Sequence, residues 1–110
     1  MGCNKAGLII RGTTPTIVMT YKTIDVSDIV EAYLTIRQSA NKVEINKTIA
    51  NADIGEKTLS WKLTQEDTLQ IDGRYSVEIQ CRYLLNDGTA GSSAVYDIPA
   101  YKILRDGVIE

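Results

Sequence analysis

The stretch YSVEIQCRYLL, residues 75–85, carries the clearest structural pattern in the chain. Apolar or aromatic side chains occupy every odd position, and polar ones occupy every even position except Leu84. A period of two predicts a half-buried β-strand. Its length favours a central strand, and its register should be fixed because a one-residue slip would expose the whole apolar set.

The same alternation recurs in three other segments, which we therefore expect to be strands. Their predicted core-facing sets are Ile17, Met19 and Tyr21, then Ala32, Leu34 and Ile36, and finally Leu59, Trp61 and Leu63. Asn41 and Lys42 separate the second segment from a short strand at 43–49, so these two are expected to form a hairpin. Residues 8–11 are a further candidate strand.

The last strand region follows Asn86-Asp87-Gly88, a strong turn sequence, and extends over residues 93–102. Pro99 interrupts it. Because proline cannot donate a ladder hydrogen bond, this region is predicted to be an edge strand or a bulged strand.

Two short helical turns are expected between strands. Ser27 is a candidate cap for residues 28–31, and Thr64 with Asp67 three residues later resembles a capping box. Neither turn is long enough for a helical layer. The sequence therefore predicts one all-β domain over residues 1–110, a two-sheet antiparallel sandwich of about seven strands, with a flexible start at 1–7.

Composition and charge exclude several classes of function. The 12 Lys and Arg and the 14 Asp and Glu are interspersed and give a net charge of −2, without the basic face that nucleic-acid binding requires. No apolar run approaches the ~20 residues needed to cross a bilayer, and the first residues lack a secretory signal. A cytoplasmic location without membrane contact is expected. Cys3 and Cys81 are too far apart in sequence to suggest a disulfide framework, and Cys81 is expected to be buried and inert.

Catalytic chemistry is not indicated. The chain has no histidine, which removes the commonest general base and the commonest metal ligand. The acidic pairs Glu66 with Asp67 and Asp25 with Asp28 flank predicted turns, where capping and solvation account for them. We expect no catalytic residues, no metal and no cofactor.

Tyrosines supply the candidate interaction surface. Tyr21, Tyr75 and Tyr83 fall on predicted inward positions. Tyr33 falls outward, and with Val18 and Leu84 it is a candidate exposed apolar patch on a sheet face, of the kind that often marks partner contacts. Isolated exposed apolar residues are also normal, and that interpretation stays open. The edge at Pro99 is a second candidate for pairing with another chain.

Several stretches together resemble short prophage proteins encoded among the tail genes of Gram-positive bacteria. These stretches are RGTTPT at 11–16, DVSDI at 25–29, AYLTIRQ at 32–38, LSWKLTQE at 59–66, YLLNDGT at 83–89 and ILRDGVI at 103–109. The strand pattern of those proteins is similar to that of the immunoglobulin-like N-terminal domain of phage baseplate upper proteins. The resemblance covers most of the chain.

The resemblance implies an immunoglobulin-like sandwich and a non-enzymatic role in phage tail or baseplate structure or assembly. Other tail or baseplate proteins would be its partners, with homo-oligomers as a further form, in the host cytoplasm or in the virion. The alternative is an immunoglobulin-like module that binds a ligand or glycan through exposed tyrosines such as Tyr33.

Overall fold

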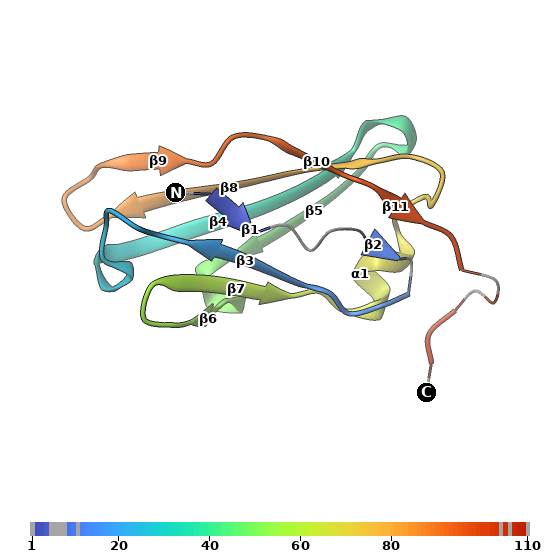
Figure 1. Ribbon diagram of the computed structural model, residues 1–110, viewed down its shortest axis with the longest axis horizontal. Helices are drawn as coiled ribbons and strands as arrows, with labels where there is room; N and C mark the ends of the chain where they lie inside the picture. Colours follow the sequence, from blue (N-terminus) through green and yellow to red (C-terminus); the bar gives the residue numbers. More distant parts are fainter. Residues whose placement is uncertain (1, 5–8, 11, 104, 106, 110) are drawn as a thin grey trace.

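Two antiparallel sheets form the layers of the molecule (Figure 1). The computed structural model describes residues 2–4, 9–10, 12–103, 105 and 107–109. One sheet contains, in spatial order, β1 (Gly2–Asn4), β3 (Thr16–Thr20), β7 (Thr58–Lys62) and β6 (Asp53–Ile54). The other contains β10 (Tyr96–Ile98), β8 (Val77–Leu85), β4 (Ile29–Gln38) and β5 (Val43–Thr48), with β9 (Ala90–Ser92) also paired to β8. A small parallel pair joins β2 (Ile9–Ile10) to β11 (Ala100–Tyr101).

The strand order is that of an immunoglobulin-like sandwich. Taken in chain order, β1, β3, β4, β5, β6, β7, β8 and β10 correspond to strands A, B, C, C′, D, E, F and G. The two sheets then have the orders A-B-E-D and G-F-C-C′, which combine the constant-type A-B-E-D sheet with the C′ addition of variable-type domains. The predicted fold class, an all-β two-sheet antiparallel sandwich, is confirmed.

Strand β8 is central, as its sequence predicts. It pairs with β4 on one side and with β10 and β9 on the other. Val77, Ile79 and Cys81 are buried on its inner face. The prediction for Tyr75 is wrong: this side chain is 46% exposed. It precedes the strand in a turn, where its N–H donates to the carbonyl of Asp72 at 3.4 Å.

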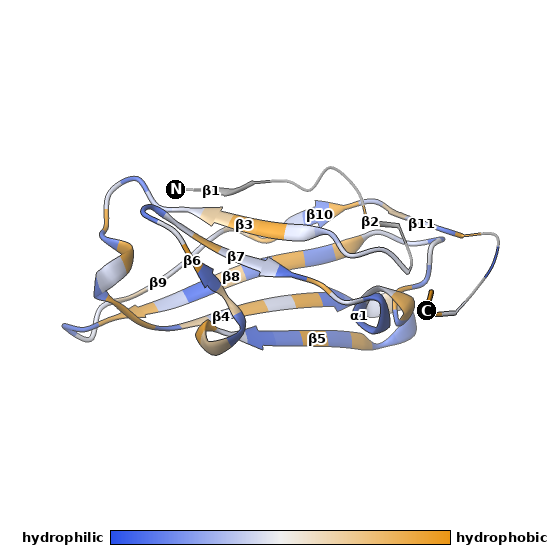
Figure 2. Cartoon of the chain, turned by 90° about the horizontal axis from the view of Figure 1, so that it is seen from below, coloured by the Kyte–Doolittle hydropathy of each residue, from blue (hydrophilic) through white to orange (hydrophobic). Residues whose placement is uncertain are grey.

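The core lies between the sheets and contains the predicted inward sets of β3, β4 and β7. Figure 2 shows apolar and polar residues alternating along β4 and β8. Trp61 is 1% exposed, and its indole N–H donates to the carbonyl of Thr48 at 2.9 Å. Because Trp61 belongs to β7 and Thr48 to β5, this bond links the two sheets at one side of the sandwich.

The capping box at Thr64 is confirmed. It begins α1 (Gln65–Leu69), with Asp67 N–H donating to the Thr64 hydroxyl and Thr64 N–H donating to the Asp67 carboxylate. The described residues also contain the 3-10 turns η1 (Val26–Asp28), η2 (Ser39–Asn41) and η3 (Ile49–Asn51), more than the one or two expected.

The predicted Ser27 cap is wrong. Ser27 lies inside η1, which has no side-chain cap, and the chain is already extended at Ile29. The cause is tertiary, because Ile29 enters the ladder between β4 and β8 opposite Leu85. Pairing of the backbone in the sheet replaces the helical turn that the local sequence favours.

At Pro99 the chain passes from one sheet to another. β10 is an edge strand, as predicted, and Pro99 ends it. The Pro99 carbonyl accepts the N–H of Ile9 at 2.9 Å, so β11 continues beside β2. Ile9 and Ile10 confirm part of the predicted strand at 8–11, whose outer positions 8 and 11 lie outside the described residues. Of the expected flexible start, residues 2–4 form β1 against β3, and residues 1 and 5–7 lie outside the described residues.

Candidate functional site

The outer face of the β10-β8-β4-β5 sheet carries two exposed apolar side chains side by side. Tyr33 of β4 is 49% exposed and Leu84 of β8 is 39% exposed. Both positions alternate with core-facing neighbours, so both side chains leave the sheet on the solvent side. The register places Arg82 opposite Tyr33 and Glu31 opposite Leu84, which gathers these four residues in two adjacent rows.

A hollow of about 180 Å³ opens beside Tyr33. We call it the Tyr33 hollow, and it is lined by Glu31, Ala32, Tyr33, Arg82, Tyr83, Leu84 and Ala90. Two features account for it. The β4–β8 register shifts between Ile29 and Glu31, as in a β-bulge, and Ala90, which pairs with Leu84, has only a methyl group as its side chain.

The two charged side chains at the rim of the hollow, Glu31 and Arg82, differ in their hydrogen bonds and ion pairs. One carboxylate oxygen of Glu31 accepts the N–H of Ala32 at 2.9 Å and the N–H of Ile49 at 3.2 Å. Arg82, in contrast, forms no ion pair with any carboxylate in the described part of the chain. The hollow therefore has an exposed guanidinium on one side and a carboxylate held by backbone groups on the other.

The same face continues along β4 and β8 with complementary polar pairs. Thr35 lies opposite Gln80, and Arg37 lies opposite Glu78 with a guanidinium–carboxylate distance of 3.6 Å. Val95 is 50% exposed and lines a second hollow of about 210 Å³ with these residues. Local alternation does not identify Val95, because its position beside β8 is set by the pairing of β10, which begins at Tyr96, with β8.

The predicted three-residue patch needs a correction. Tyr33 and Leu84 lie together, but Val18 belongs to β3 in the other sheet, where it pairs with Ser60 and Asn4. Val18 is half-buried and faces away from the core side that Ile17 and Met19 occupy. The sequence assigned all three to the outside, and only the sheet topology separates them onto opposite faces of the sandwich.

Tyr21 and Tyr83 have structural roles. Tyr21 is buried, and its ring meets that of half-buried Tyr83 edge to face at 5.5 Å. The Tyr83 side chain also lies directly over Gly91, so closely that an added Cβ would overlap it. These contacts confirm Tyr21 as a core residue and place Tyr83 at the border of the core.

Asp67 is a structural carboxylate. Burial raises its pKa, but the backbone hydrogen bond from Thr64 and the ammonium of Lys47 outweigh burial, so its pKa lies below the usual value. The Lys47 Nζ–Asp67 Oδ2 distance is 2.9 Å. Glu66 beside it is exposed. Capping accounts for Asp67 and exposure to solvent for Glu66, as the sequence suggests.

The second acidic pair is also tied to a turn. The N–H of Asp28 donates to the carbonyl of Asp25 at 3.0 Å, which closes η1. Both aspartates line an open hollow of about 310 Å³ together with Lys22 and Lys57. Two cations beside two carboxylates leave no net charge there to select a ligand of one sign.

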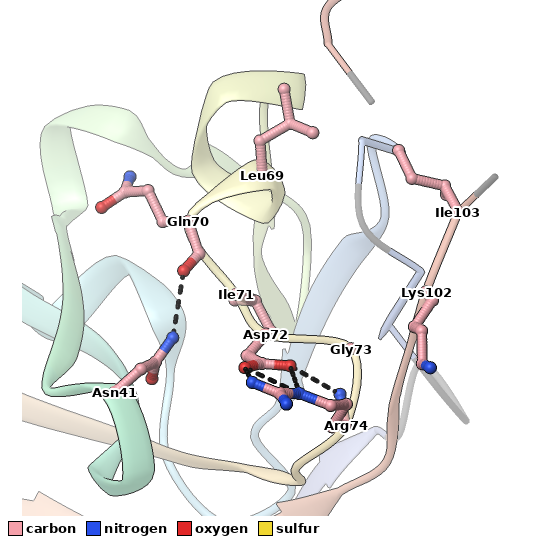
Figure 3. Close-up of a pocket in the computed structure, with 9 residues that line it drawn as sticks. All are labelled: Asn41, Leu69, Gln70, Ile71, Asp72, Gly73, Arg74, Lys102 and Ile103. Carbon is pink, nitrogen blue, oxygen red and sulfur yellow. Dashed lines mark hydrogen bonds and ion pairs between the residues drawn. The ribbon is translucent and has the colours of Figure 1, made fainter. Parts of the chain in front are cut away.

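A larger hollow of about 410 Å³ lies beyond the end of α1 (Figure 3). Three of the polar side chains that line it are bound within the loop and its surroundings. The Asp72 carboxylate accepts the Arg74 Nε and Nη2 groups at 3.1 and 2.8 Å, and Asn41 donates to the carbonyl of Gln70 at 3.4 Å. The hydrogen bond and charge of Asp72 raise the pKa of Arg74. This hollow therefore results from how the loop is held.

In the described part of the chain, no three Cys, Asp or Glu side chains gather closely enough to hold a metal ion. No helix among those residues is long and apolar enough to cross a membrane. Fold and surface together define an immunoglobulin-like sandwich with two exposed apolar side chains, Tyr33 and Leu84, side by side on one sheet face. No protein-family model matches the chain, and no curated protein matches it.

Proposed function

We propose that this protein is a non-enzymatic structural or assembly component of a phage tail or baseplate, and that it acts by protein–protein contact. The single observation that carries the contact role is the exposed pair Tyr33 and Leu84 beside the Tyr33 hollow, with Arg82 at its rim. Tyrosine and arginine are enriched at protein interfaces, and arginine and tyrosine are frequent hot-spot residues. The phage setting rests on the sequence resemblance.

A sheet face suits this role better than a sheet edge. The edge strand β5 carries Lys47 on its inner face, opposite buried Leu34, and the ammonium is tied to Asp67 of α1. Inward-pointing charges on edge strands discourage pairing with another chain. At the other edge, β10 has only three residues and ends at Pro99. The face around Tyr33 has no such protection.

Within this proposal the partners are other tail or baseplate proteins. The net charge of −2 and the mixed signs along the chain do not favour nucleic acid. The proposed location is the host cytoplasm during assembly, with incorporation into the virion as the end state.

The test begins with purified phage particles and tail assembly intermediates from a host that carries the gene. Mass spectrometry should detect the protein in one of these fractions. Consistent absence from both would rule out the proposal. A pull-down with the tagged protein should enrich tail or baseplate proteins, and Tyr33→Ala should abolish this enrichment. Val18→Ala, on the opposite face, is the matched control and should retain it.

The exposed ring of Tyr33 also favours one alternative, an immunoglobulin-like glycan-binding module. That alternative predicts signal on a glycan array which Tyr33→Ala removes and Val18→Ala keeps. A blank array removes its support. Binding to a glycan without any enrichment of tail proteins would favour it over the phage assembly role.

A further inference from the structure

We propose that the first partner of this face is a second copy of the same chain. Two sandwiches would pack through their β10-β8-β4-β5 sheets about a two-fold axis that runs between β4 and β8, parallel to both strands. Each Tyr33 ring would enter the Tyr33 hollow of the other copy. The inference rests on the proposed contact role of this face.

The cross-strand register makes the face self-complementary. Three successive rows pair Tyr33 with Arg82, Thr35 with Gln80, and Arg37 with Glu78. A two-fold axis between the strands sets β4 of one copy over β8 of the other. Each of these residues then faces, across the interface, the residue that is its cross-strand neighbour within its own sheet. Tyr33 faces Arg82 of the second copy, for example. This is the condition for an isologous interface, in which the same patch is used by both subunits.

The hollow has the size of a side chain. Pockets for small-molecule ligands measure roughly 300–1,000 Å³. The Tyr33 hollow measures about 180 Å³, which suits one inserted side chain better than a free ligand. Its rim carries the guanidinium of Arg82, which is free of carboxylates in the described structure and can lie over the face of an incoming tyrosine ring.

Charge favours a second copy over an unrelated partner of one sign. The two central strands present Arg37 and Arg82 together with Glu31 and Glu78 on this face. A uniformly acidic or basic partner would bury like charges against half of them, and such juxtapositions disfavour binding. In the two-fold arrangement Arg37 of each copy faces Glu78 of the other, so that two Arg37–Glu78 pairs form across the interface.

Sedimentation velocity of the full chain, from low to high micromolar concentrations, tests the proposal. We expect a reversible equilibrium between the 12.1 kDa monomer and a dimer. Tyr33→Ala should weaken the dimer at least tenfold in Kd. Val18→Ala, on the opposite face, should leave the Kd unchanged. A wild-type chain that stays monomeric throughout this range overturns the proposal, as does an equal effect of both variants.

Charge reversal tests the geometry. Arg37→Glu and Glu78→Arg should each weaken the dimer, and the double variant should restore it. Circular dichroism of each variant separates this effect from unfolding, since Arg37 is exposed and Glu78 half-buried in the monomer. Single reversals that leave the Kd unchanged overturn the two-fold arrangement. A monomeric chain that still recovers tail proteins overturns self-association alone, and a dimer absent from phage particles overturns only the tail role.

Discussion

The side-chain amide of Gln38 forms two hydrogen bonds with the backbone of Asp72. Its carbonyl oxygen accepts the Asp72 N–H at 2.7 Å, and its Nε2 donates to the Asp72 carbonyl at 2.8 Å and to the Tyr75 carbonyl at 2.9 Å. Gln38 is the last residue of β4 and is 1% exposed. One buried amide thereby fixes the loop that leads from α1 into the central strand β8.

Replacing Gln38 should loosen this loop. Gln38→Ala leaves the N–H and carbonyl of Asp72 without this partner, and a lost buried hydrogen-bond partner costs about 1–3 kcal/mol. Urea unfolding should show a loss in that range. The control is Asn41→Ala, which removes one exposed bond of 3.4 Å and should change the stability by less than about 0.5 kcal/mol. Equal losses in both variants would contradict the role given to Gln38.

Gly73 should tolerate no side chain. An added Cβ would lie 2.5 Å from the backbone nitrogen of Lys102 and 2.7 Å from the carbonyl carbon of Tyr101. Gly73→Ala must therefore push the segment after β11 away, at a cost of about 1–3 kcal/mol. Hydrogen exchange should become faster at Ile9, whose N–H bonds to Pro99 next to β11. Ser76→Ala, in the same loop, should leave both measurements unchanged.

Asp67 should make stability depend on pH in the acid range. Its pKa is lowered in the folded state, so its contribution is complete above the unfolded value of about 3.9 and is lost as pH falls through the folded pKa. At neutral pH, Asp67→Asn should cost about 1–3 kcal/mol. Denaturant titrations should show this difference shrinking below about pH 4. The exposed neighbour gives the control, since Glu66→Gln should produce no comparable pH-dependent difference.

Trp61 should contribute through both its volume and its indole N–H. Trp61→Phe removes the bond to the Thr48 carbonyl and leaves space in the core, with an expected loss of about 1–3 kcal/mol. For a domain of this size, each kcal/mol lowers the Tm by roughly 4–8 °C, which thermal circular dichroism can measure. Tyr75→Phe changes an exposed ring and should shift the Tm little. A similar shift in both would contradict the placement of Trp61 as the link between sheets.

The alternating strands were predictable because their period reflects burial on one face. Residues 59–63 and 77–81 occupy the positions that alternation predicts, with Leu59, Trp61 and Ile79 in the core. Tyr75 fits the same period but lies outside the strand, because the Gln38 amide binds the 72–75 turn. The Thr64 cap was predictable because its hydrogen bonds join residues three positions apart. The Ser27 cap was predicted wrongly because the backbone at Ile29 pairs with the distant strand β8 instead of continuing a helical turn.

The sequence by itself determined the all-β class, a central strand within residues 75–85, the turn chemistry around Thr64 and the outward position of Tyr33. These depend on local bonds and on a period of two, which neighbouring residues encode. Only the tertiary structure decided that Leu84 and Val95 join Tyr33 on one face while Val18 lies on the other. Alternation tells inside from outside, but which strands share a sheet depends on pairing between residues far apart in the chain.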